Sequence, residues 1–259
     1  MPALSAPTKT APSMNDYQAP ADLLRDRVIL VTGAGDGIGK AAALAYAAHG
    51  ATVVLLGKTI SKLEACYDAI VAAGSPEPAI YPLHMEGAAP QDYEELAAKI
   101  EENFGRLDGI LHNAASIPWL SRIDDYDADV WVKMLQVNLT APFLITQACL
   151  PLLRKAPDAA ILFTTDVVGQ KGKAYWGAYA AAKGGIERLT EVLAEELEKS
   201  AIRVNVIDPG PTRTALRKRL YPALDLTDTP TPESRMPLYL WLMGPDSAGT
   251  RGQRLSCAD

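Results

Sequence analysis

A tyrosine and a lysine four residues apart, Tyr179 and Lys183, are the pair in this sequence best suited to proton transfer. In a helix, side chains at this spacing lie on one face and can contact each other. A nearby ammonium favours the phenolate, so we expect it to lower the tyrosine pKa from about 10. Such a tyrosine could donate a proton to a carbonyl oxygen or accept one from an alcohol. Taken alone, however, the spacing could arise by chance.

A second chemical feature is the glycine-rich segment TGAGDGIG, residues 32–39. Glycines allow a tight turn and let backbone N–H groups approach a pyrophosphate at a helix N-terminus. An apolar run precedes the segment and a helical stretch follows it, which favours nucleotide binding over a merely flexible turn. We therefore expect a dinucleotide to contact this set of residues: Gly33, Gly35, Asp36, Gly37, Ile38 and Gly39.

The residue after the second apolar run indicates which dinucleotide is preferred. NAD sites usually place an Asp or Glu there, which binds the ribose 2′-hydroxyl. This chain has Lys58 instead, which could pair with a 2′-phosphate, so NADP(H) is favoured over NAD(H). Two observations oppose this interpretation: a single lysine is often only a solvated surface residue, and Asp36 would repel a phosphate.

The elements that must position these residues alternate along the chain. Apolar and β-branched runs predict strands, the last of them weak, at residues 28–31, 52–56, 79–83, 107–112, 159–164, 202–207 and 250–255. Helical periodicity predicts helices at residues 40–49, 61–73, 93–104, 128–153, 179–199 and 237–243. The stretch 128–153 is one or two helices, with Pro142 and Pro151 as possible breaks or starts.

This alternation, at steps of about 25–30 residues, predicts an α/β fold. Specifically, we expect a Rossmann-type doubly wound parallel sheet of about seven strands, with helices on both faces, in a single domain over residues 21–259. Residues 1–20 are rich in Pro, Ala, Ser and Thr and predict a flexible tail, within which Met14 could be the natural start. The proline-rich stretch 212–237 predicts a substrate lid within the domain.

Composition excludes several classes of function. The 259 residues are 48% hydrophobic and carry a formal net charge of −6, so we expect a large core and no nucleic-acid partner. No apolar run approaches the roughly 18 residues that would predict a membrane span. Three scattered cysteines and three scattered histidines form no disulfide framework and have no metal-ligand spacing. We therefore expect no metal site and a cytoplasmic location.

Together, five motifs resemble the short-chain dehydrogenase/reductase family. They are the glycine-rich segment from Thr32, the sequence His112-Asn113-Ala114-Ala115, Asn138, the Tyr179-x-x-x-Lys183 pair, and Pro209-Gly210. They occur in the family's order and spacing and span roughly residues 26 to 253. Further segments, such as Arg106-Leu107-Asp108-Gly109, are similar to those of a poorly characterised bacterial cytoplasmic subgroup.

The resemblance implies an NADP(H)-dependent oxidoreductase that transfers hydride between nicotinamide and a carbonyl or alcohol substrate. Tyr179 would be the general acid/base, and Lys183 would bind the nicotinamide ribose and lower the tyrosine pKa. Asn138 would hold a water that links Lys183 to solvent. Members of the family commonly form homodimers or homotetramers, which we expect here.

The resemblance also assigns cofactor-binding residues along the later strands. Asn113, with Ala114 beside it, would line the adenine-ribose side, and the segment with Pro209, Gly210 and Thr212 would bracket the nicotinamide. Without the resemblance, Asn113 and Asn138 would more readily be interpreted as capping or turn residues.

One position departs from the family pattern. The family usually has a serine thirteen residues before the tyrosine, and this chain has Asp166 there. An ionised carboxylate only accepts hydrogen bonds, and its charge would raise the pKa of Tyr179. Asp166 could be protonated and donate as serine does, could accept a hydrogen bond from the substrate, or could cripple turnover. The last possibility leaves a second hypothesis, a dinucleotide-binding protein with little or no catalysis. Thr165 could replace the serine only if the strand end shifts by one residue.

The sequence suggests an apolar or aromatic substrate pocket beneath a basic lid. Its candidate lining residues, each of which could also be ordinary packing, are Ile117, Pro118, Trp119, Gln170, Tyr175, Trp176, Leu216 and Tyr221. The basic cluster on the lid, which could bind an acidic substrate or the cofactor phosphate or simply be solvated, comprises Arg213, Arg217, Lys218 and Arg219.

Overall fold

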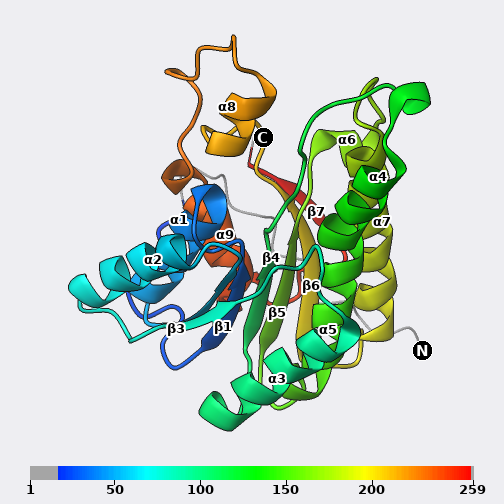
Figure 1. The fold of residues 1–259 in the computed structure, drawn as a ribbon. Helices are drawn as coiled ribbons and strands as arrows, with labels where there is room; N and C mark the ends of the chain where they lie inside the picture. Colours follow the sequence, from blue (N-terminus) through cyan, green and yellow to red (C-terminus); the bar gives the residue numbers. More distant parts are fainter. Residues whose placement is uncertain (1–16, 258–259) are drawn as a thin grey trace.

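A seven-stranded parallel sheet forms the centre of the molecule (Figure 1). The computed structural model describes residues 17–257. The strand order is β3-β2-β1-β4-β5-β6-β7. The strands are β1 Val28–Thr32, β2 Thr52–Gly57, β3 Ala79–Pro82, β4 Gly109–His112, β5 Ala159–Thr164, β6 Ile202–Asp208 and β7 Arg254–Ser256. The predicted doubly wound sheet of about seven strands is confirmed.

Helices cover both faces of this sheet (Figure 1). They are α1 Gly37–Ala48, α2 Ile60–Ala72, α3 Pro90–Phe104, α4 Ala128–Leu135, α5 Ala141–Leu153, α6 Val167–Gln170, α7 Gly177–Glu196, α8 Ala215–Leu220 and α9 Met236–Met243. One core contains residues of α1, α2 and α9, and the other contains residues of α3, α5 and α7. No helix within residues 17–257 is long and apolar enough to cross a membrane.

The first strand shows why a continuous apolar run folds in this way. All five residues of β1 are buried, and successive side chains point to opposite faces of the sheet. Ile29 and Val31 enter the core with α1, whereas Val28 and Leu30 enter the core with α3. A strand that is buried on both faces needs apolar residues at every position.

The sheet has a topological switch point between β1 and β4. From β1 the chain proceeds to β2 and β3 on one side, and it returns through α3 to β4 on the other. Loops from the carboxyl ends of these two strands therefore diverge and leave a crevice, the usual ligand site of such sheets. The glycine-rich turn follows β1, and Asn113 follows β4.

The stretch 128–153, predicted as one or two helices, forms two, α4 and α5, joined by a π-helical turn at Gln136–Thr140. Pro142 is near a helix start, as predicted, whereas some other predicted boundaries are wrong. Pro142 lies in the first turn of α5, where proline is tolerated, and the helix continues past Pro151. The stretch 212–237 contains the helix α8, and the last strand is shorter than predicted and starts at Arg254.

Most of the predicted tail lies outside the described residues. Its last four residues, 17–20, are described, and they contact the domain. Tyr17 and Ala19 pack against the core that contains α1 and α9. The Tyr17 hydroxyl also donates to Asp246 at 2.9 Å. The packed part of the chain thus includes residues that the sequence assigned to the tail.

Candidate active site

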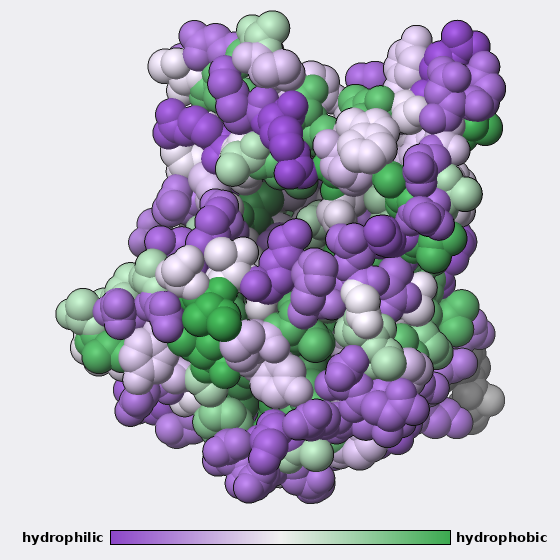
Figure 2. Space-filling model, viewed as in Figure 1, coloured by the Kyte–Doolittle hydropathy of each residue, from purple (hydrophilic) through white to green (hydrophobic). Residues whose placement is uncertain are grey.

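A cavity of about 1230 Å³ lies at the carboxyl ends of the strands. The surface is hollowed between α8 and the part of the molecule that contains α6 (Figure 2). The sequence-predicted residues that line it are Gly33, Gly35, Asp36, Gly37, Ile38, Lys58, Asn113, Ala114, Asp166, Tyr179, Lys183, Pro209, Gly210 and Thr212. Two predicted residues, Gly39 and Asn138, do not line it. The topology thus brings segments far apart in sequence into one site.

The turn after β1 requires its glycines. Gly33 has a φ of +70°, and a Cβ there would lie 3.0 Å from the Cα of Ala114. Gly39 lies behind the cavity wall, where a Cβ would be 2.2 Å from the carbonyl oxygen of Gly33. The first turn of α1 therefore packs directly on the glycine-rich loop. Its N-terminus, where N–H groups lack helical partners, faces the cavity.

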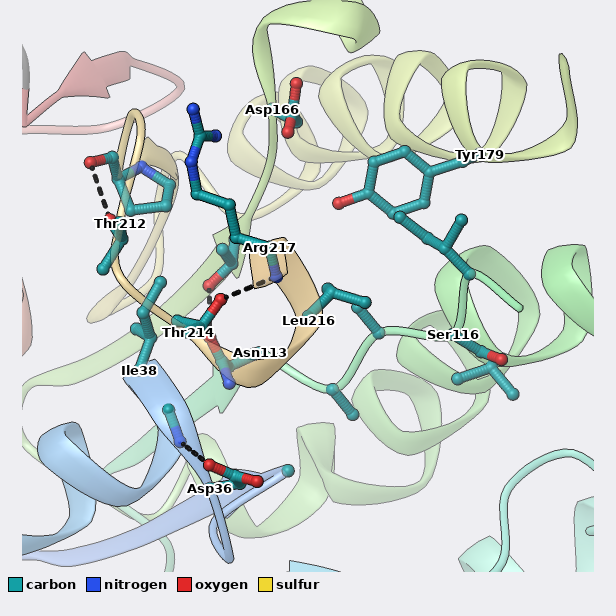
Figure 3. A pocket seen from close by; sticks show the side chains of 18 of the residues that line it. Asp36, Ile38, Asn113, Ser116, Asp166, Tyr179, Thr212, Thr214, Leu216 and Arg217 are labelled. Carbon is teal, nitrogen blue, oxygen red and sulfur yellow. Dashed lines mark hydrogen bonds between the residues drawn. The ribbon is translucent and has the colours of Figure 1, made fainter. Parts of the chain in front are cut away.

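Asp36 begins α1 as its N-cap, and its carboxylate accepts a hydrogen bond from the N–H of Gly37 at 2.7 Å (Figure 3). Lys62, on α2, pairs with the other carboxylate oxygen at 2.5 Å. This ammonium holds the Asp36 pKa below its ordinary value. The sequence missed Lys62, whose charge offsets the repulsion expected between Asp36 and a phosphate. Lys58 lines the same end of the cavity.

Thr32 joins the ends of β1 and β4. Its hydroxyl oxygen accepts hydrogen bonds from the N–H groups of Asn113 at 3.0 Å and Ala114 at 3.1 Å. The Asn113 side chain accepts from Thr164 at the end of β5, at 3.4 Å. The asparagine therefore links strand ends as well as lining the cavity. Thr32 stood in the predicted motif, but no feature of the sequence indicated this bonding role.

Tyr179 and Lys183 lie in the first two turns of α7, and both side chains are buried. The lysine Nζ is 5.3 Å from the centroid of the tyrosine ring and donates to the carbonyl of Thr164 at 2.7 Å. Burial lowers the Lys183 pKa to about 8, against an opposing effect of Asp166. The predicted contact of the pair is present.

The predicted lowering of the Tyr179 pKa by Lys183 is wrong, whereas the predicted raising of this pKa by Asp166 is borne out. Burial raises this pKa, and the carboxylates of Asp166 and Asp208 raise it further. Removing a phenolate from water disfavours the charged form, and neighbouring negative charges add to this effect. The phenol is therefore protonated at neutral pH in the described protein, so Tyr179 holds the proton that an acid must donate.

Asp166 follows β5 and is the N-cap of the short helix α6. Its carboxylate accepts from the N–H of Val168 at 3.1 Å. It lines the cavity wall that also carries Tyr179 (Figure 3). The preceding residue, Thr165, is buried and donates to Glu187 at 2.9 Å, which leaves its hydroxyl engaged away from the substrate. Both residues line the cavity, but only Asp166 has a polar side-chain group that is not engaged by Glu187.

Asn138 lies in the π-helical turn between α4 and α5, and its side chain is fully engaged. Its amide donates to the carbonyls of Ser116 and Met134, both at 2.8 Å, and its oxygen accepts from the N–H of Ser116 at 3.1 Å. The side chain therefore fixes the loop after β4 rather than the cavity surface. Single π turns are frequent near functional sites.

A partly buried ionic network, two of whose members line the cavity, lies near Tyr179 and Lys183, and the sequence did not indicate it. Arg254 on β7 pairs with Glu187 on α7 at 3.2 Å and with Asp208 at the end of β6 at 2.5 Å. The other oxygen of Asp208 accepts from the N–H of Gly210, whose φ is +63°. The network thus holds the turn Pro209–Thr212 against the helix that carries Tyr179. Only the folded sheet brings these charges together.

Most of the residues predicted to line a substrate pocket do line the cavity, with two corrections. The predicted residues that line it are Ile117, Pro118, Gln170, Trp176, Leu216 and Tyr221. Trp119 and Tyr175 do not line it, and both side chains are more than half exposed to solvent. The Thr214 cap of α8 lies over the glycine-rich turn, where a Cβ on Gly37 would be 3.2 Å from its methyl group. The lid therefore spans both ends of the cavity.

Known proteins share this architecture. The short chain dehydrogenase family matches residues 27–225. The uncharacterized oxidoreductase YciK of Escherichia coli K12 is 44% identical over 91% of this chain and 93% of that protein. A Pseudomonas syringae structure assigned as a short chain dehydrogenase is 50% identical, with a TM-score of 0.89 over 93% of this chain and 99% of its own. An Escherichia coli CFT073 structure of the same description, complexed with NADPH, is 44% identical, with a TM-score of 0.90 over 93% and 100%. The chain belongs to the short-chain dehydrogenase/reductase family and is an oxidoreductase of that family.

Proposed function

We propose that this protein is an NADP(H)-dependent oxidoreductase that interconverts a carbonyl compound and an alcohol, with Tyr179 as the general acid/base. The observation that carries the proposal is the arrangement of the cavity. Tyr179 and Lys183 share it with a glycine-rich turn at a helix N-terminus, at the switch point of a parallel sheet. A proton donor and a dinucleotide site are thus combined in one place.

The residues present fit a dinucleotide. Gly33, Gly35 and Gly37 line the cavity without side chains, which leaves bare backbone for a pyrophosphate, and Gly39 lets α1 pack against this turn. Lys58 supplies positive charge at the adenosine end, where Lys62 offsets the charge of Asp36, and this suits a 2′-phosphate. The relative from Escherichia coli CFT073 was solved with NADPH, in agreement with this preference. When bound, the nicotinamide ring would supply or take up the hydride.

The pKa directions assign the proton to the tyrosine. Because the Tyr179 pKa is raised, the hydroxyl is protonated and can donate to a carbonyl oxygen as it gains negative charge. Lys183, with a pKa of about 8, is largely an ammonium at pH 7 and stabilises the phenolate left behind. The two groups are therefore in the protonation states that reduction of a carbonyl requires.

Asp166 makes proton release from Tyr179 harder than a serine would. Its carboxylate raises the tyrosine pKa and cannot act as a donor when ionised. It could instead accept a hydrogen bond from a substrate hydroxyl or amine. We propose a competent enzyme in which Asp166 selects the substrate, because the catalytic pair and the cofactor cradle are both present.

The proposal is tested by oxidation of NADPH and NADH, followed at 340 nm, with a panel of ketones, aldehydes and quinones. We expect turnover of at least one carbonyl compound and a lower KM for NADPH than for NADH. Tight NADPH binding without turnover of any compound would contradict the enzymatic proposal and support a binding protein. Tighter binding of NADH would contradict the assigned cofactor.

We also propose a homo-oligomer in the cytoplasm. Val132 on α4, Phe143 on α5 and Val192 on α7 are exposed apolar side chains on the same outer layer of helices. The three cysteines are buried and free, which suits a reducing compartment. Light scattering after gel filtration should give a mass of two or four chains, and a monomer at micromolar concentration would contradict this expectation.

A further inference from the structure

Arg217, on the lid helix α8, lines the cavity without a carboxylate partner among residues 17–257. Its Nε is buried and has no hydrogen-bond partner in the described part of the chain. The guanidinium carbon lies 5.3 Å from the centroid of the Tyr221 ring. Figure 3 shows the side chain extending into the cavity, on the side where Asp166 lies. A buried donor without an acceptor is costly, so a ligand atom that accepts from it would bind favourably.

Other cationic side chains of this wall, which are partly or fully buried or tie α8 to the domain, already have hydrogen-bond acceptors. Lys183 donates to the carbonyl of Thr164, and Arg254 is paired with two carboxylates. Arg219, two residues along the lid, donates to the carbonyl of Ile117 at 2.6 Å and so ties α8 to the loop after β4. Arg217 therefore differs from its neighbours in presenting an unmatched guanidinium to the cavity.

A continuous aromatic wall connects this guanidinium to the proton donor. The Tyr221 ring is 6.4 Å from the Trp176 ring, and the Trp176 ring is 5.7 Å from the Tyr179 ring, centroid to centroid. Leu216 packs against the cluster that contains Tyr179. The space along this wall is apolar, with a positive group at the lid and the Asp166 carboxylate near Tyr179. At the tyrosine end the Asp166 carboxylate would repel an anion and the nearby Lys183 ammonium would offset part of this repulsion, whereas at the lid end the guanidinium would attract it.

We propose that the substrate is an anionic carbonyl compound whose carboxylate or phosphate binds Arg217 while its carbonyl group lies at Tyr179. This inference rests on the proposed function. The planar guanidinium suits such a group because it can form two parallel hydrogen bonds with it. An apolar or aromatic body between the two polar ends would contact the wall. A phosphate of the cofactor has the same chemistry, so the test must separate the two sources.

The test measures binding of benzoate and of benzamide, its neutral analogue of similar shape, to the protein saturated with NADPH. Quenching or enhancement of NADPH fluorescence reports the binding. We expect benzoate to bind at least about ten-fold more tightly than benzamide, since a charged hydrogen-bonded pair is stronger than a neutral one. Arg217→Gln should remove this preference, and Arg217→Lys should restore part of it.

Lys218→Gln is the matched control. Lys218 lies on the same helix, donates to the carbonyls of Pro222 and Leu224, and does not line the cavity. It should keep the wild-type preference for benzoate. NADPH affinity should change less than about two-fold in Arg217→Gln if the arginine serves the substrate.

Two results would overturn the inference: equal binding of benzoate and benzamide to the wild type, or weaker NADPH binding with unchanged benzoate binding in Arg217→Gln. Reduction of benzaldehyde and of 4-carboxybenzaldehyde, measured in parallel, distinguishes failure of this inference from failure of the proposed function. Reduction of both without preference for the acid leaves the function standing and overturns the inference. Loss of benzoate preference in Arg217→Gln without any carbonyl reduction supports the anion site and contradicts the function.

Discussion

Two aspartates cap helices at the same edge of the sheet, yet they have different consequences. Asp36 follows β1 with φ −155° and ψ 160°, and Asp166 follows β5 with φ −152° and ψ 156°. Each accepts a hydrogen bond from a backbone N–H of the helix it begins. Asp36 pairs with Lys62, whereas Asp166 faces the cavity beside Tyr179 and raises its pKa.

The comparison shows that a cap determines where a carboxylate points but not what it does. Local backbone geometry is almost the same at the two positions. The neighbours, supplied by α2 in one case and by α7 in the other, decide whether the charge is offset or acts on a phenol. The end of the cavity near Asp36 is suited to binding the cofactor, and the end near Asp166 is suited to proton transfer. The predictions that follow test this division.

The largest effect should come from Tyr179→Phe, which removes the phenol hydroxyl, and with it the transferable proton, near Asp166. General acid catalysis contributes roughly 10²- to 10⁴-fold, so carbonyl reduction should fall by about that factor. NADPH affinity, measured by fluorescence titration, should change less than about two-fold. Surviving turnover would show that the acid/base assignment is wrong.

A smaller effect, on binding, is expected from Gly39→Ala at the Asp36 end. The new Cβ would lie 2.2 Å from the Gly33 carbonyl and would displace the loop. Overpacking costs about 1–3 kcal/mol, which corresponds to a roughly ten- to hundred-fold weaker NADPH affinity if the strain falls on the loop. Gly87→Ala is the control, because its Cβ would meet no atom within 4 Å. Equal affinities in the two variants would contradict the close packing of this turn.

Lys62→Ala should have a still smaller effect. Losing the ammonium leaves the Asp36 charge unopposed beside the adenosine end of the cavity, so NADPH should bind up to about ten-fold more weakly, with less change for NADH. Adding Asp36→Asn, which keeps a capping side chain, should restore part of the affinity. Because the two side chains of the pair are half exposed, the free energy of unfolding, measured by thermal unfolding, should change by about 1 kcal/mol or less. Unchanged NADPH affinity in Lys62→Ala would contradict the role given to this pair.

The smallest effects should be changes in stability when either capping aspartate is replaced by serine. Serine caps helices about as well as aspartate, so Asp36→Ser and Asp166→Ser should each change the free energy of unfolding by about 0.5 kcal/mol or less. Urea unfolding measures both. A loss of several kcal/mol in one variant alone would show that the two caps are not structurally equivalent.

The sequence predicts much of the fold and of the cofactor end, because their signals are local. Apolar runs identify the first six strands, whereas the weak last strand predicted over 250–255 overlaps β7 only at its end, and the spacing of Gly33, Gly37 and Gly39 identifies the turn. The lid and the far side of the site depend instead on contacts across the sheet. α8 lies in a proline-rich stretch, and the short helix α6 has no periodicity to detect. Pro151 failed as a signal of a helix end, since α5 continues past it.

The same distinction explains the errors at the site. The i, i+4 spacing predicts correctly that Tyr179 and Lys183 meet, but the tyrosine pKa depends on burial and on Asp208, which comes from another strand. The partner of Asp36 lies 26 residues away on α2. Arg254, near the end of the chain, reaches the network only because β7 pairs with β6. Sequence position alone provides no sign of these three relations.

The pH dependence of NADP⁺-dependent alcohol oxidation tests the division most directly, in the wild type, Asp166→Ser and Asp36→Ser. This reaction needs the phenolate, so its rate rises with pH through the apparent pKa of the catalytic pair. Asp166 raises the pKa values of both Tyr179 and Lys183, so its removal lowers both. The rise should therefore move to lower pH in Asp166→Ser and stay in place in Asp36→Ser. An unchanged profile in Asp166→Ser, or an equal shift in both variants, would contradict the account.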